Sequence, residues 1–325
     1  MTWIMHEVLR AHVETCRPYT LWYPGLVGLA GGAYGTHTAW RLLLAWAVPT
    51  LGWVAGHYLG DYYDRRLDAI SKPHRPIPSG RLRAGTAAKV GAGLGALAVA
   101  LAIPANWRAV LLVAAALAGI VVYSRVLKGR GLSGNVIRGV LTALALVVGA
   151  MMTAPQPSWR LLPFALVFLV HDTASNLVGT LRDVDGDRDG GYRTSAVRHG
   201  VRAAARLAVA LYAGAVVVAV LSARALSAYT GAYLALLAVA VVLGTAACVL
   251  LLRRTPSPEV ALRAHEVLVA ERLVLAAAVL AGGAGLWPAV AVLVLALALS
   301  VPMQMAMRAR YEFSLEGGNP YGRRR

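Results

Sequence analysis

Two short acidic segments combine residue types and spacings that are suited to binding metal ions. The first segment, G-D-Y-Y-D-R-R-L-D, has carboxylates at Asp61, Asp64 and Asp68. The second, R-D-V-D-G-D-R-D, has a carboxylate at every second residue: Asp183, Asp185, Asp187 and Asp189. Carboxylates gathered in this way repel one another unless a cation relieves the repulsion. These segments are therefore the first candidates for a functional site.

The spacing of the polar residues predicts a stripe on each of two helices. At about 100° per residue, one narrow arc contains His57, Asp61, Asp64 and Asp68. If the second helix continues unbroken, one of its faces contains Asp172, Asn176, Asp183 and Asp187. Each stripe begins in an apolar run and ends in an acidic segment. We therefore expect two helices to present carboxylates toward a shared space.

Two facing acidic stripes are suited to holding Mg²⁺ and a diphosphate. Mg²⁺ usually takes one or two carboxylates together with substrate phosphates, so two or three ions could surround one diphosphate. Nearby basic side chains would neutralise the remaining charge: Arg65, Arg66, Lys128, Arg182, Arg188 and Arg193. Arg75, in a proline-rich loop, could face the diphosphate or lie at lipid headgroups. The simpler alternative is that each acidic segment is a solvated charge run that ends a helix.

The elements that position these residues are predicted to be transmembrane helices. The chain has 325 residues, of which 58% are hydrophobic and 14% charged, whereas soluble domains have roughly 25% charged residues. This composition excludes a soluble enzyme, a disordered chain and a disulfide scaffold. Because a span needs about 20 apolar residues, we predict ten, near 19–36, 40–60, 85–104, 107–124, 135–153, 160–181, 203–222, 229–252, 266–283 and 287–307.

The basic residues are distributed unevenly between the two ends of these predicted spans. Of 32 Lys and Arg residues, the turns at one end contain four, Arg41, Arg108, Arg160 and Arg224, which leaves 28 for the rest of the chain. The positive-inside rule makes the richer face, both termini and the acidic segments cytoplasmic. We expect an integral protein of the cell inner membrane that binds no nucleic acid. Residues 1–325 are predicted to form a single integral-membrane domain, with 308–325 as a flexible tail.

Three segments resemble signatures of the UbiA-type intramembrane prenyltransferases. Residues Gly60 to Gly80 resemble the family's N-D-x-x-D-x-x-x-D followed by R-P-I-P-S-G, and Leu181 to Thr194 resemble its second aspartate signature. Between them, Y-S-R-V-L-K-G-R-G-L-S-G-N resembles the family's Y-S-x-x-L-K-R segment. The resemblance implies an all-α polytopic transmembrane helical bundle of about nine to ten spans, with a cytoplasmic cap of loops over a central cavity.

The resemblance also implies an activity: Mg²⁺-dependent ionisation of a polyprenyl diphosphate and attachment of the isoprenyl group to an aromatic or lipid-like acceptor. The implied catalytic residues, which hold two or more Mg²⁺, are Asp64, Asp68, Asp183 and Asp187. The resemblance and the charge pattern together indicate seven diphosphate-binding residues: Arg17, Asp61, Arg65, Lys128, Asn176, Arg188 and Arg193. Candidates for stabilising the allylic cation through aromatic faces are Tyr58, Tyr62 and Tyr123, although tyrosines are also common at membrane interfaces.

One departure from the family pattern keeps a second reaction open. Gly60 stands where the family has Asn, so that side-chain amide is missing; Asp61 or Asn176 could compensate. An altered site is compatible with a UbiA-type terpene cyclase, in which the chain's own double bonds capture the cation. A more remote alternative is an ion-coupled transporter, but transporters place such charges near the bilayer midplane, whereas these carboxylates lie at the ends of the predicted spans.

Overall fold

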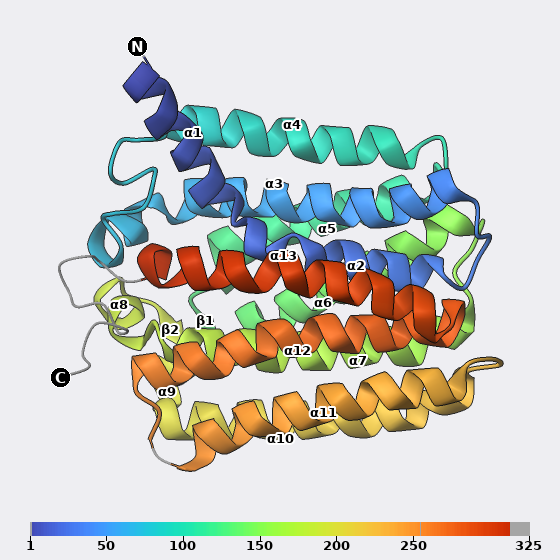
Figure 1. Ribbon diagram of the computed structural model, residues 1–325. Helices are drawn as coiled ribbons and strands as arrows, with labels where there is room; N and C mark the ends of the chain where they lie inside the picture. The colour runs from blue at the N-terminus through green and yellow to red at the C-terminus, as the bar shows by residue number, and fades with distance from the viewer. Residues whose placement is uncertain (1, 254, 313–325) are drawn as a thin grey trace.

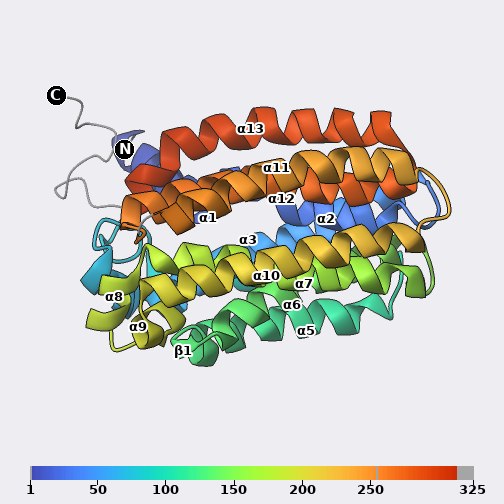
Figure 2. The ribbon, with the colours of Figure 1, turned by 90° about the horizontal axis from the view of Figure 1, so that it is seen from below.

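The chain forms a bundle of roughly parallel helices (Figures 1 and 2). The computed structural model describes residues 2–253 and 255–312. The described α-helices are α1 (Thr2–Cys16), α2 (Trp22–Gly32), α3 (Ala39–Ser71), α4 (Ala84–Ala102), α5 (Ala109–Val122), α6 (Ser133–Thr153), α7 (Leu162–Leu181), α8 (Val184–Asp189), α9 (Ser195–His199), α10 (Val201–Ser222), α11 (Thr230–Arg253), α12 (Pro258–Ala284) and α13 (Leu286–Glu312). Short 3₁₀ or π turns cover Pro18–Thr20, Tyr123–Leu127, Trp159–Leu161 and Ala223–Ala225.

The predicted transmembrane bundle is confirmed. Within the described residues, nine helical segments are long and apolar enough to cross a membrane. The first predicted span, near 19–36, is the one not among them: it contains α2, which has only 11 residues and is about 16 Å long. Every residue of α2 from Tyr23 to Gly32 except Leu29 is buried, so α2 packs inside the bundle.

The ends of several helices differ from the prediction. α3 continues to Ser71, eleven residues beyond the predicted end at 60, so its acidic segment is helical. The predicted hairpin near 283–287 turns at Gly285, whose φ of 89° suits glycine. α13 continues to Glu312, five residues into the segment predicted to be a flexible tail, and residues 313–325 lie outside the described part.

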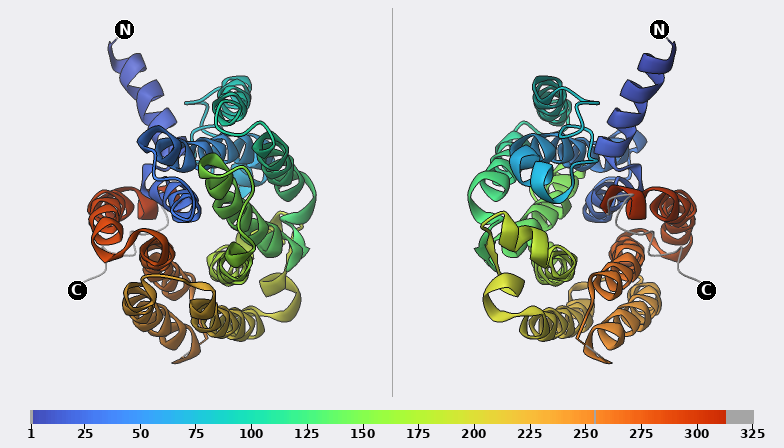
Figure 3. Two further views of the ribbon diagram at one scale, coloured as in Figure 1. Left: turned by 90° about the vertical axis from the view of Figure 1, so that its right-hand side faces the viewer. Right: turned by 90° about the vertical axis from the view of Figure 1, so that its left-hand side faces the viewer.

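The core of the bundle depends on small residues that let helix backbones approach closely. A Cβ atom added at Gly149 of α6 would lie 1.9 Å from the carbonyl oxygen of Gly28 on α2. Such contact between small residues is typical of membrane helices, where lipid offers no hydrophobic driving force for association. α12 is the most enclosed span, with 78% of its apolar window buried, and it packs against α2, α7, α11 and α13 in the bundle that Figure 3 shows end-on.

The two ends of the bundle differ in chemistry. At one end, on the left in Figure 1, lie the acidic segments, the short helices α8 and α9, and two strands, β1 (Arg130–Gly131) and β2 (Arg193–Thr194). The strands pair in parallel, with Arg130 opposite Arg193, and join two loops. The other end contains the starts of α3, α5 and α13 and the turn before α7. Four exposed tryptophans lie there, as is common at a membrane interface: Trp40, Trp107, Trp159 and Trp287.

Candidate active site

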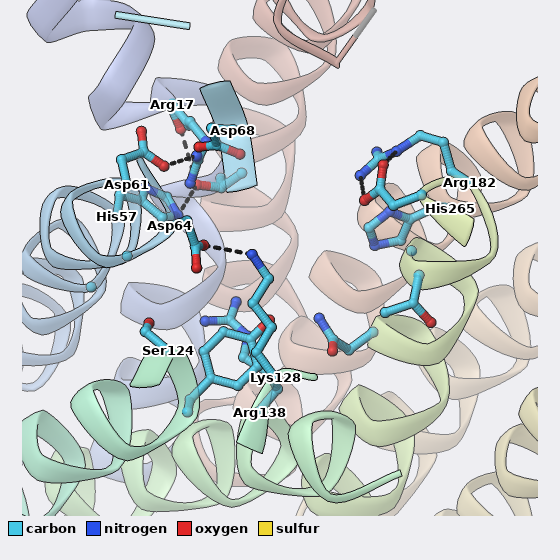
Figure 4. A pocket seen from close by; sticks show the side chains of 18 of the residues that line it. Arg17, His57, Asp61, Asp64, Asp68, Ser124, Lys128, Arg138, Arg182 and His265 are labelled. Atoms are coloured by element: carbon cyan, nitrogen blue, oxygen red, sulfur yellow. Dashed lines mark hydrogen bonds and ion pairs between the residues drawn. The ribbon is translucent and has the colours of Figure 1, made fainter. Parts of the chain in front are cut away.

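A polar cavity of about 390 Å³ lies among the helices at the acidic end of the bundle. Its wall is formed by residues of α3, α6, α7, α8 and α12 and by the segments that precede α2 and α6. The two acidic segments enter it from different sides. In Figure 4, Asp61, Asp64 and Asp68 of α3 lie on one side, Arg182 and His265 lie across from them, and Lys128 reaches in from the segment before α6.

Each aspartate of the first segment is paired with a basic side chain. Arg17 contacts Asp61 at 2.5 Å, and the Lys128 ammonium donates to Asp64 Oδ2 at 2.5 Å. Arg75 donates to both oxygens of Asp68 at 3.0 Å, so this loop arginine faces the site rather than lipid headgroups. All three carboxylates are buried, and a buried charge needs a counter-charge, which these basic side chains supply.

The second segment reaches the cavity in a different way from that predicted. The condition of an unbroken helix is not met: α7 ends at Leu181, and Asp183 has φ −98° and ψ 10°, outside the helical region, before α8 begins. Asp172, Asn176, Asp183 and Asp187 nevertheless all line the cavity. Asp183 accepts hydrogen bonds from Arg182, at 3.0 and 2.8 Å, and from Lys72, at 3.0 Å. Lys72 directly follows α3, so this ion pair joins the two acidic segments.

The cavity changes the ionisation of two residues outside the spans. Burial lowers the pKa of Lys128, but electrostatic interactions with Asp64, Tyr123 and Asp68 and the hydrogen bond to Asp64 together outweigh burial and raise that pKa well above its ordinary value. Burial, followed by repulsion from Asp183, raises the pKa of Asp187 to about 6. Lys128 is therefore a permanent cation, whereas Asp187 is a carboxylate that gains from a nearby positive charge.

The carboxylates fit divalent metal ions. Asp64 Oδ1 is buried without a hydrogen-bond partner in the described structure, and an orphaned carboxylate oxygen is the donor that a hard cation prefers. Among the described residues, no three acidic, His or Cys side chains converge on one ion position. An ion bound here would thus take one or two carboxylates and complete its shell with other oxygens, as Mg²⁺ does with phosphates and water.

The structure brings together nine of the predicted site residues. The cavity wall contains Arg17, Asp61, Asp64, Asp68, Tyr123, Lys128, Asn176, Asp183 and Asp187. Asn176 accepts a hydrogen bond from Asn135 at 3.0 Å. Gly60 also lines the cavity, and a Cβ there would meet only Ser124 Oγ, at 3.9 Å. The place of the missing family Asn is therefore open space beside the cavity.

Five predicted residues lie outside the cavity wall. The Arg65 guanidinium covers the ring of Tyr62 at 4.5 Å. Arg188 pairs with Asp185 on the surface, and Arg193 is exposed in β2. Tyr58 is buried elsewhere, 2.9 Å from His12 Nδ1. These five were selected because they neighbour the motifs in sequence, but adjacent residues of a helix point in directions about 100° apart.

Three basic residues in the cavity wall were not predicted: Lys72, Arg138 and Arg272. Lys72 lies just beyond the end of α3. Arg138 lies inside helix α6, between Ile137 and Gly139, and Arg272 lies inside helix α12, where it follows Glu271 within an otherwise apolar run. The available signal was that a lone charge within a predicted span faces a bundle interior and is a functional candidate by default.

Beyond the cavity lies a buried network of polar side chains. Asp172, whose carboxylate lines the cavity, accepts hydrogen bonds from Tyr23 at 2.8 Å and from Thr142. Its neighbour His171 lies 2.6 Å from Glu271 on α12. The network joins α2, α6, α7 and α12, so it fixes the inner wall of the cavity.

A second, apolar cavity of about 60 Å³ adjoins the polar one. It lies between α2, α3, α5 and α6, and both cavities share the residues Trp53, Gly56, Ile120 and Arg138. Its other lining residues are apolar or glycine, including Gly52, Leu117 and Leu141. We call this space the apolar groove. The polar site thus continues directly into an environment suited to a hydrocarbon chain.

Comparisons with known proteins agree with this architecture. The family model of the UbiA prenyltransferase family matches residues 21–265. A digeranylgeranylglyceryl phosphate synthase from Korarchaeum cryptofilum (strain OPF8) is 34% identical over 214 residues, which cover 66% of this chain and 76% of that protein.

Two solved structures share the fold. The apo structure of a UbiA homolog from Aeropyrum pernix K1, 17% identical, has a TM-score of 0.69 and covers 80% of this chain and 96% of that one. A UbiA homolog from Archaeoglobus fulgidus bound to GPP and Mg²⁺, 16% identical, has a TM-score of 0.63 and covers 83% of this chain and 99% of that one. The family match, the relative and the bundle agree, and the chain belongs to the UbiA prenyltransferase family as a membrane-embedded prenyltransferase.

Proposed function

We propose that this enzyme transfers an isoprenyl group from a prenyl diphosphate to a lipid-like or aromatic acceptor in a Mg²⁺-dependent reaction. The observation that carries the proposal is the meeting of two acidic segments, from α3 and from α7–α8, in one cavity that also contains Lys128 and opens into the apolar groove. A relative named for digeranylgeranylglyceryl phosphate and a structural neighbour bound to GPP and Mg²⁺ support the lipid acceptor and the allylic donor.

In this proposal the ion pairs of the cavity exchange partners when substrate binds. Asp64, Asp68, Asp183 and Asp187 would hold the metal ions, which would supply positive charge next to the diphosphate. Lys128 and Arg17, now on Asp64 and Asp61, turn toward diphosphate oxygens with which they form charge-assisted hydrogen bonds. Asp61 and Asn176 orient these donors, and Lys72, Arg75 and Arg182 complete the basic lining.

The chemical step is heterolysis of the bond between the allylic carbon and the diphosphate oxygen. The electron pair leaves with the diphosphate, where Lys128 and Arg17 stabilise the developing negative charge. The allylic cation beside Tyr123 is attacked by the acceptor hydroxyl or ring carbon, and the released diphosphate accepts the acceptor's proton. The isoprenoid tail lies in the apolar groove, where hydrocarbon burial is favourable.

The topology follows from the distribution of charge. We infer that the acidic end of the bundle and both chain termini face the cytoplasm, where water-soluble Mg²⁺ and the released diphosphate can exchange.

The decisive experiment measures diphosphate release and product formation together. Purified protein is incubated with Mg²⁺ and radiolabelled geranyl, farnesyl or geranylgeranyl diphosphate, with and without geranylgeranylglyceryl phosphate or a hydroxybenzoate. We expect prenylated acceptor, and a loss of about 100-fold or more in Asp64→Asn, since even the outer-shell partners of metal ligands are worth 10–100-fold. The control Asp189→Asn alters an exposed carboxylate of the second segment and should retain activity.

Two results would contradict the proposal. A hydrocarbon product formed without acceptor would show that the enzyme is a cyclase. Equal turnover in wild type and Asp64→Asn would show that the aspartates do not hold the reacting complex.

A further inference from the structure

The first helix precedes the part of the chain that the family model matches, and it leaves the bundle sideways. α1 covers Thr2–Cys16, whereas the matched residues begin at 21. In both views of Figure 3, α1 projects outward from the spans on the side where α13 lies. Its inner face is fixed to the bundle, because Ala11 and Thr15 are buried and His12 Nδ1 lies 2.9 Å from the Tyr58 hydroxyl. α1 is therefore an ordered element with a free outer part.

A groove of about 740 Å³ lies between α1, the end of α13 and the loop that joins α3 to α4. We call it the α1 groove. Its apolar wall consists of Leu9 and Val13 of α1 and Ala306 and Met307 of α13. Leu9 is 64% exposed and Val13 is 42% exposed. α1 thus presents apolar side chains to a space that the described residues leave open.

Charged side chains of both signs line the same groove. The carboxylate of Glu14 pairs with Arg10 at 3.0 Å and with Arg81 at 2.7 Å. Three further polar residues line the groove: His6, Glu7 and His74. An apolar face bordered by charged residues is typical of helices that lie at the boundary between headgroups and acyl chains. The groove therefore offers the two environments that one phospholipid needs.

The α1 groove is continuous with the surface that membrane lipid covers. α13 is one of the nine described spans, and its side chains Val301 and Met305 are 38% and 76% exposed. Met305 directly precedes Ala306 in the groove wall, so acyl chains that cover the outside of α13 reach the mouth of the groove. Because apolar surface in contact with water is unfavourable, a lipid chain suits this space better than water does.

We propose that the α1 groove holds one phospholipid from the leaflet at the acidic end of the bundle. An acyl chain lies against Leu9, Val13 and Met307, and the headgroup phosphate accepts hydrogen bonds from Arg10 and Arg81. α1 then lies in the interfacial layer and covers the lipid, as amphipathic helices do. The inference goes beyond the proposed function and concerns lipid binding alone.

A lipid at this position also lies next to the candidate active site. Arg75 lines both the α1 groove and the polar cavity, and its guanidinium donates to both oxygens of Asp68. Water weakens the attraction between two charges. A lipid in the groove therefore excludes water from one side of this ion pair.

Fluorescence quenching tests which molecule occupies the groove. In a full chain whose Cys16 and Cys248 are replaced by Ala, a bimane label is attached at Leu9→Cys, Val242→Cys or Ser79→Cys. The vesicles contain phosphatidylethanolamine and phosphatidylglycerol with brominated acyl chains. We expect bromine to quench the label at Leu9→Cys as strongly as at Val242→Cys, a residue of α11 that is 69% exposed. Iodide in the water should quench only Ser79→Cys, on the exposed loop.

Two quenching results would overturn the inference. Iodide quenching at Leu9→Cys as strong as at Ser79→Cys means that water fills the groove. Quenching by neither reagent means that a protein segment fills it. Both results leave the proposed function intact, because the measurement uses no substrate.

Retention of lipid tests the contact residues. Native mass spectrometry of wild type released into mild detergent should show one retained phospholipid. A double variant, Leu9→Gln with Val13→Gln, should retain it about tenfold less or weaker, because two apolar contacts are lost. Both side chains are exposed, so the substitutions leave the packing of the bundle unchanged.

The matched control makes the same change on the same helix. Val8 is 41% exposed and lies outside the described lining of the groove, so Val8→Gln should retain the lipid. Equal retention in wild type and the double variant, or an equal loss in Val8→Gln, contradicts a lipid held in the α1 groove.

Discussion

At the scale of single residues, the buried carboxylate of Asp187 lowers the folding stability of the protein when it is ionised. Its carboxylate is 6% exposed, and burial with repulsion from Asp183 raises its pKa to about 6. A carboxyl group whose pKa is raised on folding favours the unfolded protein once it is ionised. The penalty is therefore full above pH 6, and it disappears below about pH 4, where the group is protonated in both states.

Asp187→Asn should consequently stabilise the metal-free protein. In EDTA at pH 7 we expect a higher Tm, corresponding to a gain of up to about 3 kcal/mol, and we expect the gain to shrink when Tm is measured at pH 5. Mg²⁺ with diphosphate should raise the Tm of wild type and have less effect on the variant, which has lost a ligand. If the Tm difference is absent at pH 7, or does not change with pH, folding does not raise the pKa of Asp187.

The same scale shows which site residues a sequence can reveal. Asp61, Asp64, Asp68 and Lys128 were predictable because they belong to contiguous motifs in which helical spacing gives a common direction. Arg138 and Arg272 were not predictable in this way, because they reach the same cavity from two helices, α6 and α12, that are distant in sequence. The one available sign was the presence of charged residues inside predicted spans, Arg138 alone in its span and Arg272 beside Glu271.

At the scale of elements, the helices place the polar cavity next to the apolar groove. Apolar periodicity and length predicted most spans, because a segment that crosses lipid must satisfy its backbone hydrogen bonds internally, as an α-helix does. The break between α7 and α8 was not predictable by periodicity, since the stripe from Asp172 to Asp187 is compatible with a continuous helix. The break matters because it lets Asp183 meet Lys72 and so joins the two acidic segments.

The apolar groove leads to a prediction about donor length. Gly52 of α3 lines it, and a Cβ at this position would meet no atom within 4 Å, so a leucine there would fill the groove instead of disrupting packing. We expect Gly52→Leu to reduce kcat/KM for geranylgeranyl diphosphate by about tenfold, a loss comparable to excluding one to two methylenes from a hydrocarbon site, and to affect geranyl diphosphate less.

A matched control distinguishes a blocked groove from a damaged helix. Gly93 of α4 also has open space at its Cβ position but does not line the groove, so Gly93→Leu should leave the dependence on donor length unchanged. If Gly52→Leu reduces turnover of all three donors equally, the tail does not lie in the groove.

At the scale of the whole molecule, the two ends of the bundle meet the membrane surfaces differently. Four exposed tryptophans mark one end, and three of them lie beneath a neighbouring arginine, Arg41, Arg108 or Arg160, at 4.8 to 5.9 Å. Aromatic rings of this kind sit at the headgroup level. The acidic end has most of the described Lys and Arg residues and the candidate active site. A helix such as α11, with 24 residues, is about 36 Å long and spans the roughly 30 Å hydrocarbon core between these ends.

This asymmetry predicts the orientation, which can be measured by cysteine labelling. In a chain whose own Cys16 and Cys248 are replaced by Ala, Ser79→Cys places a thiol on an exposed loop at the acidic end, and Ser158→Cys places one at the tryptophan end. A membrane-impermeant maleimide should label Ser79→Cys in inside-out vesicles and Ser158→Cys in right-side-out vesicles, because the positive-inside rule holds the end with more Lys and Arg in the cytoplasm. The opposite pattern would mean that the active site opens outward. Prenyl diphosphate and Mg²⁺ would then have to be supplied from outside the cell, so the labelling result also tests whether the proposed reaction has access to its substrates.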